Sequence, residues 1–400
     1  MADLITRTLT GTGTDDYFAV LRAAFLTDES LEQFQEILDP DRSHGVFDGS
    51  ELIGVCSRLA PEMTLPGGTR SPVAAVTAVG VKPGHRRRGV LTSLMRAQLH
   101  GLHDDRGAPI AALFASEGAI YGRFGYGVAS YEVKLAVPGG APFLSTVDTG
   151  TQPVREVPRA DALEIIRGLY PAATSTGWLT RDDGTWEFRV ADDRNASGGQ
   201  GKLHYAVHPG GFALYRPERG WTERGPDFKL HVEELVATTP QSYAALWRYL
   251  LDVDLVGEVH QNKAAVDEPI THLLANPRAA IRRVADGLWV RLVDVDRALP
   301  ARRYSAPLDL VFELTDAFCP WNAGRWRLTA GDDGVAEVRR TGESAQLELD
   351  TADLASAFLG GNTLTALHRT GRITELEPGA LRRASAAFAT DRAPHCPEGF

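Results

Sequence analysis

The chain of 400 residues has little of several features that mark particular classes of protein. It has three cysteines, Cys56, Cys319 and Cys396, and their odd number and wide spacing exclude a disulfide framework and a zinc pattern. No run of about 18 apolar residues occurs, so no membrane-spanning segment is expected. The N-terminus lacks a basic region followed by an apolar one, which argues against a signal peptide and predicts a cytoplasmic protein.

An excess of positive charge is also missing. Lys and Arg number 42 against 52 Asp and Glu, which gives a formal net charge of −10. This argues against nucleic acid as the main partner, because nucleic-acid sites are usually basic. It suits a cationic small molecule, although many cytoplasmic proteins are acidic for no such reason. The composition is that of a globular protein, and the length predicts two or three domains.

Against this acidic background stands a run of three arginines in "VGVKPGHRRRGVLTSLMRAQLH", residues 79–100. A strand is predicted to end at Val81. A loop that contains Arg86, Arg87, Arg88 and Gly89 follows, and then a helix with one apolar face. A helix N-terminus presents unpaired N–H groups and a partial positive charge of about +0.5. Glycine lets an anion approach the backbone. The pattern predicts a pyrophosphate site, with a solvated basic loop as the alternative.

Changes in composition divide the chain. Residues 137–154 are rich in Gly, Pro, Ser and Thr and predict a domain boundary. A second α+β region follows, and the composition changes again near Val293. The predicted domains are residues 1–145, 146–297 and 298–400. Helices are predicted near 16–38, 91–102, 160–170, 242–251, 352–358 and 379–389, and a hairpin is predicted around Asp48-Gly49.

The strand–R-x-x-G–helix unit, followed by "APIAALFAS" and "IYGRFGYG", resembles the GCN5-related (GNAT) N-acetyltransferases. Leu91 stands where the general motif has Gly or Ala. "HRRRGVL" together with "ASEGAIYGRFGYG" resembles a narrower branch, the Eis (enhanced intracellular survival) family, and this resemblance extends over the whole chain. It implies an α+β fold with two GNAT-like domains in tandem, the second without a cofactor site, followed by a sterol-carrier-protein-like C-terminal domain.

The resemblance implies acetyl-CoA as co-substrate and no metal. The strand end would contact the pantetheine arm, the arginine loop would hold the pyrophosphate, and Ser116 and Glu117 would lie beside the thioester. The implied cofactor-binding residues are Val79, Gly80, Val81, Arg86, Arg87, Arg88, Gly89, Val90, Leu91, Thr92, Ser116 and Glu117.

Two catalytic groups are also implied by the resemblance. Tyr121 would protonate the departing thiolate and is favoured over its rival Tyr126, and the alternative for Tyr121 is a buried aromatic residue whose hydroxyl is bonded locally. The C-terminal carboxylate of Phe400 would be the proton acceptor, whereas chain ends are usually frayed. The ending "PHCPEGF" has Gly399 where close relatives have an acid, with Glu398 one place earlier.

The acceptor is predicted from the region "AAFLTDESLEQF", which resembles the family's acceptor pocket. Phe25, Asp28 and Phe34 are candidates for an aromatic and acidic wall, or are ordinary residues of an amphipathic helix. The predicted activity is direct acetyl transfer to primary amines of polycationic molecules such as aminoglycosides, by a homo-hexamer of two stacked trimers. A protein-lysine or polyamine acetyltransferase and a non-catalytic lipid or acyl carrier are the alternatives.

Overall fold

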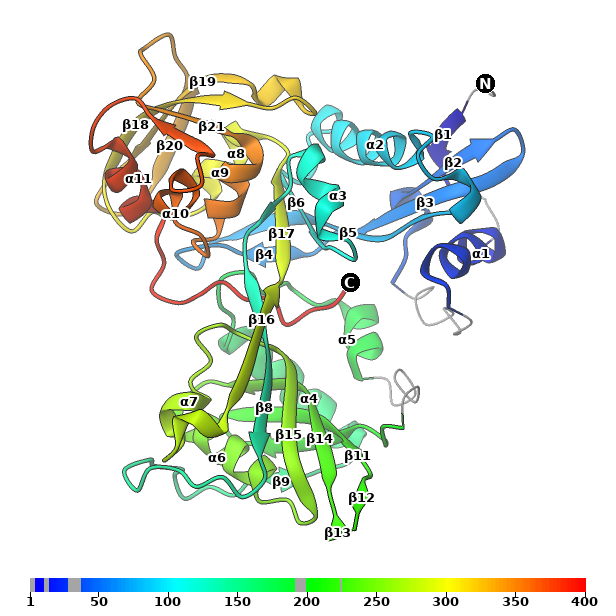
Figure 1. Ribbon diagram of the computed structural model, residues 1–400, viewed down its shortest axis with the longest axis vertical. Coiled ribbons are helices and arrows are strands. Elements are labelled where there is room, and N and C mark those ends of the chain that lie inside the picture. The colour runs from blue at the N-terminus through cyan, green and yellow to red at the C-terminus, as the bar shows by residue number, and fades with distance from the viewer. Residues whose placement is uncertain (1–3, 11–13, 28–36, 191–198, 224) are drawn as a thin grey trace. The chain divides into compact units, whose positions relative to one another are not determined.

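The computed structural model describes residues 4–10, 14–27, 37–190, 199–223 and 225–400 (Figure 1). The chain divides into two compact units. The first comprises Met1–Ser130, Thr176–Thr185 and Gly287–Phe400, and the second comprises Tyr131–Ser175 and Trp186–Asp286. Among the described helices, none combines the length and the apolar character that crossing a membrane requires.

The first unit contains a sheet in the order β1-β2-β3-β5-β6-β17-β7, with β4 paired to β5. Its strands are β1 (Leu4–Thr8), β2 (Ser43–Asp48), β3 (Glu51–Leu59), β4 (Glu62–Thr64), β5 (Arg70–Val81), β6 (Ile110–Phe114), β7 (Gly127–Val128) and β17 (Leu288–Leu292). β2 and β3 form the predicted hairpin, and Gly49 takes the positive φ of +62° at its turn. β5 and β6 are parallel, joined through helix α2 (Val90–Asp104).

The two faces of this sheet carry different helices because the side chains of a strand alternate between faces. Val46 and Ile53 point into one core with Leu94 of α2. Phe47 and Leu52 belong to another core, together with Tyr17, Phe18, Val20 and Leu21 of helix α1 (Thr14–Phe25). β5 is therefore covered by apolar packing along most of its length, and its C-terminal end leads directly into the arginine loop.

The second unit has its own seven-stranded sheet, in the order β16-β8-β15-β14-β11-β10-β9. Its strands are β8 (Tyr131–Pro138), β9 (Arg155–Glu156), β10 (His204–His208), β11 (Gly211–Glu218), β14 (Phe228–Ala237), β15 (Val256–Ala264) and β16 (Ile281–Asp286), and a small hairpin joins β12 (Trp221–Thr222) to β13 (Gly225–Pro226). Its helices are α4 (Arg159–Leu169), α6 (Pro240–Leu251) and α7 (Ile270–Leu273), and most of α5 (Asp183–Val190) also belongs to it, from Trp186 onward. α6 joins the parallel strands β14 and β15 and buries Leu246, Trp247 and Leu250 in the unit's core.

Two strands lie in a different sheet from the one that the predicted domain boundaries imply. β8 precedes the predicted boundary at residue 145, yet it pairs with β15 and β16 in the second sheet. β17 precedes the boundary predicted at 297, yet it pairs with β6 and β7 in the first sheet. Figure 1 shows β17 beside β6, although about 180 residues separate them in sequence. Each sheet therefore contains one strand from the segment that the sequence assigned to the other domain.

The last part of the chain adds a five-stranded sheet in the order β20-β19-β18-β21-β22 to the first unit. Its strands are β18 (Leu308–Thr315), β19 (Gly324–Ala330), β20 (Ala336–Arg340), β21 (Leu347–Asp350) and β22 (Ile373–Glu375), and its helices are α8 (Val295–Ala301), α9 (Thr351–Phe358), α10 (Leu364–His368) and α11 (Ala380–Phe388). One apolar core runs from Val73 and Ile110 of the first sheet to Phe312 and Phe358 here. The two sheets of this unit are therefore held by a common core.

Most predicted helices are confirmed as α2, α4, α6, α9 and α11. The helix predicted near 16–38 is described as α1 up to Phe25, and residues 28–36 lie outside the described part of the chain.

Candidate active site

The loop after β5 turns the chain sharply before helix α2. Pro83–His85 form one 3-10 turn, η3, and Arg87 and Gly89 take positive φ values of +60° and +84°. Gly89 is the N-cap of α2, and it has no side chain with which to bond the first amides of the helix. The first N–H groups of a helix have no partner within the helix. The local fold therefore leaves backbone donors and a partial positive charge at this end of α2.

The parallel strands β5 and β6 separate beside this loop. Their ladder consists of the pairs Val73–Ile110, Ala74–Ala111 and Ala75–Ala112 and ends there. β5 continues to Val81 along β3 and passes through Ala78, which has a φ of +51°. Beyond the last pair, the two strands are no longer hydrogen-bonded to each other, which leaves a gap between residues 79–81 of β5 and residues 116–117 after β6.

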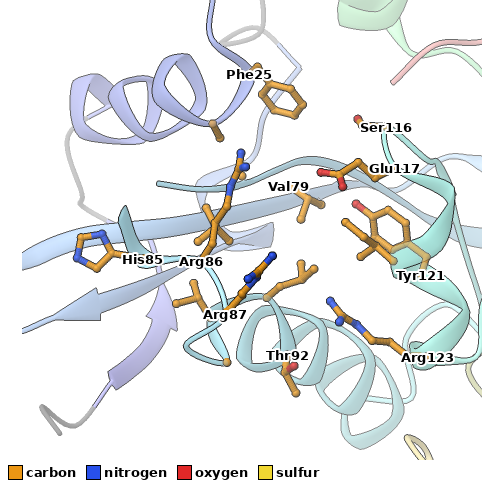
Figure 2. Close-up of a pocket in the computed structure, with 17 residues that line it drawn as sticks. Phe25, Val79, His85, Arg86, Arg87, Thr92, Ser116, Glu117, Tyr121 and Arg123 are labelled. Atoms are coloured by element: carbon orange, nitrogen blue, oxygen red, sulfur yellow. The ribbon is translucent and has the colours of Figure 1, made fainter. Parts of the chain in front are cut away.

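A cavity of about 670 Å³ occupies this gap (Figure 2). It is lined by Ala24, Phe25, Val79, Gly80, Val81, His85, Arg86, Arg87, Gly89, Val90, Leu91, Thr92, Ser116, Glu117, Ile120, Tyr121 and Arg123. The structure thus brings together the predicted cofactor-binding residues with the exception of Arg88. Arg88 donates to the carboxylate of Asp48 at 2.8 Å and is absent from the lining. Three consecutive loop side chains cannot all point the same way, and sequence could not tell which one pointed elsewhere.

Tyr121 ends the short helix α3 (Gly118–Tyr121) and lines the cavity, as does Glu117 (Figure 2). Its side chain is largely buried, and burial, followed by the neighbouring Cys56 and Glu117, raises the pKa of Tyr121 to about 12. The rival Tyr126 packs its ring against that of Tyr121, with centroids 5.9 Å apart. Tyr126 is absent from the lining, and its hydroxyl is buried with no hydrogen-bond partner among the described residues. Of the two tyrosines, Tyr121 therefore lines the cavity and Tyr126 does not.

The turn after Tyr121 requires glycines because buried groups pack directly against it. Gly125 has a φ of +82°, and a Cβ there would lie 2.8 Å from the guanidinium carbon of Arg291. A Cβ at Gly127 would lie 2.0 Å from a backbone oxygen of α9. Arg291 of β17 forms a buried ion pair with Asp316 at 2.6 Å. The glycines of "GRFGYG" thus let β17 and α9 support the turn that carries Tyr121.

The C-terminal residue reaches the end of β6. The ring of Phe400 packs against that of Phe114, with centroids 5.2 Å apart, and Phe114 lies two positions before the lining residue Ser116. Phe400 is partly buried against the common core of the first unit. It is not among the residues that line the cavity.

Of the predicted acceptor wall, Phe25 lines the cavity, and 49% of its surface is exposed. Asp28 and Phe34 lie outside the described residues. Four lining residues were not predicted, namely Ala24, His85, Ile120 and Arg123. Sequence offered a signal for two of them, because His85 adjoins the arginine run and Arg123 lies within "IYGRFGYG". Arg123 extends toward the cavity beside Tyr121 (Figure 2).

Family models match three segments of the chain. An acetyltransferase (GNAT) domain matches residues 6–129, a second acetyltransferase (GNAT) domain matches 177–292, and a sterol carrier protein domain matches 295–397. These matches confirm the predicted fold of two GNAT domains followed by a sterol-carrier-like domain. GNAT acetyltransferases use acetyl-CoA, and the gap between β5 and β6 lies in the first of the two GNAT segments.

Relatives and solved structures cover nearly the whole chain. An uncharacterized N-acetyltransferase of Streptomyces avermitilis is 41% identical over 93% of this chain and 92% of its own length. The N-acetyltransferase Eis of Mycobacterium tuberculosis is 35% identical over 97% and 98%. The crystal structure of Eis1 from Mycobacterium abscessus superposes with a TM-score of 0.87, at 34% identity and with full coverage of both chains. The chain therefore belongs to the Eis family of GNAT N-acetyltransferases.

Proposed function

We propose that the protein moves the acetyl group of acetyl-CoA directly to primary amines of polycationic acceptors of the aminoglycoside class. The observation that carries this proposal is a single cavity with Arg86, Arg87 and the start of α2 on one side, and Glu117 and Tyr121 on another (Figure 2). Anion-binding groups and acid–base groups thus share one space in the GNAT segment at residues 6–129.

The residues present fit acetyl-CoA. Val79, Gly80 and Val81 line the cavity from the strand that has parted from β6, so their backbone groups would pair with the amides of the pantetheine arm. Two arginines and the uncapped start of α2 would bind the pyrophosphate. A Cβ built on Gly89 meets no atom within 4 Å, so the backbone there is open to a phosphate.

Tyr121 would act on the leaving sulfur. Because its pKa is raised to about 12, the hydroxyl stays protonated throughout the neutral range. It is a weaker acid than an ordinary tyrosine, so full proton transfer to a thiolate of pKa near 8.5 would be unfavourable in water. In a buried site the thiolate is destabilised as well, which raises the pKa of the thiol too. Tyr121 would therefore donate a hydrogen bond as charge develops on sulfur, and would pass its proton as the C–S bond breaks.

The C-terminal carboxylate of Phe400 would accept the proton of the amine. A neutral nitrogen attacks the acyl carbon, the C–N bond forms and the C–S bond breaks. One proton goes from nitrogen to the carboxylate and one goes from Tyr121 to sulfur, and exchange with solvent restores both groups. A carboxylate is a weak base, so it would act mainly by attracting the amine and taking its proton as the nitrogen becomes acidic. The packing of Phe400 on Phe114 supports this assignment.

Transfer without an acetyl-cysteine intermediate is favoured by the state of the cysteines. Cys56, Cys319 and Cys396 are all buried. Burial raises the pKa of Cys56 to about 12 and that of Cys319 to about 11. A thiol acts as a nucleophile when it is ionised, so neither is activated.

A cationic acceptor is supported by the carboxylate of Glu117 in the lining, by the exposed ring of Phe25 and by the net charge of −10. The non-catalytic carrier alternative is disfavoured because the chain belongs to an acetyltransferase family, although its last domain resembles a sterol carrier protein. Protein lysine and polyamines remain as alternative acceptors. The homo-hexamer and the cytoplasmic location stay predictions.

The test is release of CoA from acetyl-CoA by the full chain with an aminoglycoside, spermidine or a lysine peptide. We expect the highest kcat/KM with the aminoglycoside. Deleting Phe400 should lower kcat by about 100-fold, the usual scale for an acid–base group. The matched control Phe400→Leu keeps the carboxylate and an apolar side chain, and should stay within about fivefold of wild type. Turnover of the peptide alone would contradict the acceptor class, and full activity of the deletion would contradict the base.

A further inference from the structure

The chain after α11 runs without helix or strand to Phe400, and it is tied to the short segment Thr176–Thr185 of the same unit. The backbone N–H of His395 donates to the carbonyl of Thr176 at 2.9 Å. Gly177 allows this approach, because it has a φ of +95° and a Cβ there would lie 2.6 Å from the carbonyl oxygen of His395. The tail therefore has a built backbone contact five residues before its end.

The same segment is bonded to the sheet that carries the cavity. Gly177 N–H donates to the carbonyl of Thr64 at 2.8 Å, and Thr64 N–H donates to that of Trp178 at 2.8 Å. These bonds fall on β4, which pairs with β5, and β5 supplies the lining residues 79–81. A continuous series of backbone hydrogen bonds thus links the C-terminal tail to the strand at the site.

One ion pair fixes the end of the tail to this segment. The guanidinium of Arg181 donates through Nε to Oε1 of Glu398 at 2.6 Å, and its Nη2 lies 2.5 Å from the same oxygen. The two side chains are only 0% and 5% exposed. Glu398 stands two residues before the terminal carboxylate, with Gly399 between them.

We propose that Arg181 and Glu398 are a positioning pair that holds the C-terminal carboxylate of Phe400 in place for catalysis. This inference rests on the proposed function, in which that carboxylate accepts the proton. It also assigns Glu398 a role other than acceptor binding, because its carboxylate is enclosed and already engaged by Arg181.

The physical reason is that the packing of the Phe400 ring does not by itself fix the direction of the last residues. Chain ends fray unless they are tied down. Packing of the Phe400 ring is apolar and non-directional. A guanidinium is a rigid fork, and its Nε and Nη2 both approach Oε1 of Glu398, so the pair fixes the position of this oxygen. With Glu398 held, only the backbone of Gly399 and Phe400 separates the fixed residue from the carboxylate.

The experiment is a double-mutant cycle between Glu398→Gln and deletion of Phe400, read as kcat with a saturating aminoglycoside. A misplaced catalytic group costs up to about 100-fold, so Glu398→Gln should lower kcat by roughly 10- to 100-fold. The Kd for acetyl-CoA should stay within about twofold. In the chain that already lacks Phe400, the same substitution should change kcat by less than about twofold.

Controls separate positioning from general stability. Glu375→Gln removes a carboxylate that accepts from the N–H groups of Gly379 and Leu381 at the start of α11, away from the tail, and should leave kcat unchanged. Arg181→Lys keeps the charge but loses the fork, and should give an intermediate kcat. If Glu398→Gln does not fold, Arg181→Lys takes its place in the cycle.

The outcomes are distinct. Two results would overturn the positioning role and leave the proposed function standing. In one, the two losses of kcat multiply in the double variant. In the other, Glu398→Gln keeps the full kcat whereas the Phe400 deletion is inactive. A fully active Phe400 deletion would overturn both the base assignment and the positioning role.

Discussion

The two GNAT domains contain the same strand–helix–strand unit, but its helices begin differently. In the first, β5 leads through an eight-residue loop to α2, whose N-cap is Gly89. In the second, β14 leads through two residues to α6, whose N-cap is Thr239. Thr239 Oγ1 accepts from Ser242 N–H at 3.1 Å, and Ser242 Oγ accepts from Thr239 N–H at 3.2 Å. Pro240 at the first helical position has no N–H at all.

This difference is the reason why we expect a pyrophosphate to bind in the first copy of the fold and not in the second. The reciprocal capping box engages the N–H groups of Thr239 and Ser242, so these two donors are not available to an anion. The uncapped α2 leaves its donors available, and Arg86 and Arg87 stand beside them in the cavity. A parallel strand–helix–strand unit is therefore a scaffold, and the first residues of its helix decide whether it is a site.

The largest expected effect comes from removing the hydroxyl of Tyr121, the one of the two neighbouring tyrosines that lines the cavity. Tyr121→Phe should lower kcat about 100-fold or more, because the developing thiolate loses its donor. Tyr126→Phe is the matched control and should stay within about threefold, since its hydroxyl is buried without a partner among the described residues. Steady-state CoA release measures both. The reverse pattern would make Tyr126 the acid.

The next effect concerns the arginine loop, which the second domain lacks. Arg87→Ala should raise the KM for acetyl-CoA about tenfold, the scale of one charge-assisted hydrogen bond to phosphate. Arg88→Ala should change it less than about threefold, because Arg88 forms a partly exposed ion pair with Asp48. The Arg87 effect should shrink at high salt. Equal effects of the two substitutions would contradict the geometry of the loop.

The dependence of kcat/KM on pH tests whether the hydroxyl of Tyr121 stays protonated up to high pH. Its raised pKa of about 12 means that the protonated donor persists until well above pH 10. The kcat/KM should therefore rise as the acceptor amine loses its proton, with no falling limb below pH 10. A pH–rate profile carried to pH 10.5, with the stability of the chain checked at each pH, measures this. A falling limb centred near pH 10 would show an unperturbed tyrosine.

The smallest effect is expected from removing the N-cap of α6, the corresponding helix of the second GNAT domain. Thr239→Ala removes the capping box and should lower the free energy of unfolding by about 1 kcal/mol. It should leave acetyl-CoA binding unchanged, because Pro240 still lacks a donor and no arginine loop precedes α6. Chemical denaturation and a binding titration measure the two quantities. New acetyl-CoA binding would show that the cap alone had closed the site.

The first-domain site could be predicted because its residues are close together in sequence. Strand end, loop and helix start follow one another in residues 79–92, and backbone conformation alone brings them to one place. The exception, Arg88, depends on a partner in the β2–β3 hairpin, which the loop sequence does not contain. Asp48 lies 40 residues away.

Features made by distant segments could not be predicted. β8 and β17 have the composition of buried or half-buried strands, but nothing in their residues says which sheet they join. The contact of Arg181 with Glu398 joins positions 217 apart in sequence. Both depend on long-range pairing, for which local periodicity carries no signal. The family resemblance could therefore identify Phe400 as a candidate, but no local pattern could predict the contact between Arg181 and Glu398.

The central claim is that each chain binds acetyl-CoA once, at the uncapped start of α2. Calorimetric titration of wild type and Gly89→Asp tests it most directly. An aspartate Cβ at Gly89 meets no atom within 4 Å, and its carboxylate would repel a pyrophosphate at the start of α2. We predict one acetyl-CoA per chain, an affinity about 100-fold lower in Gly89→Asp, and a somewhat lower Tm, because the φ of +84° at Gly89 strains any residue with a Cβ. Two equivalents per chain, or full affinity in Gly89→Asp, would contradict the account.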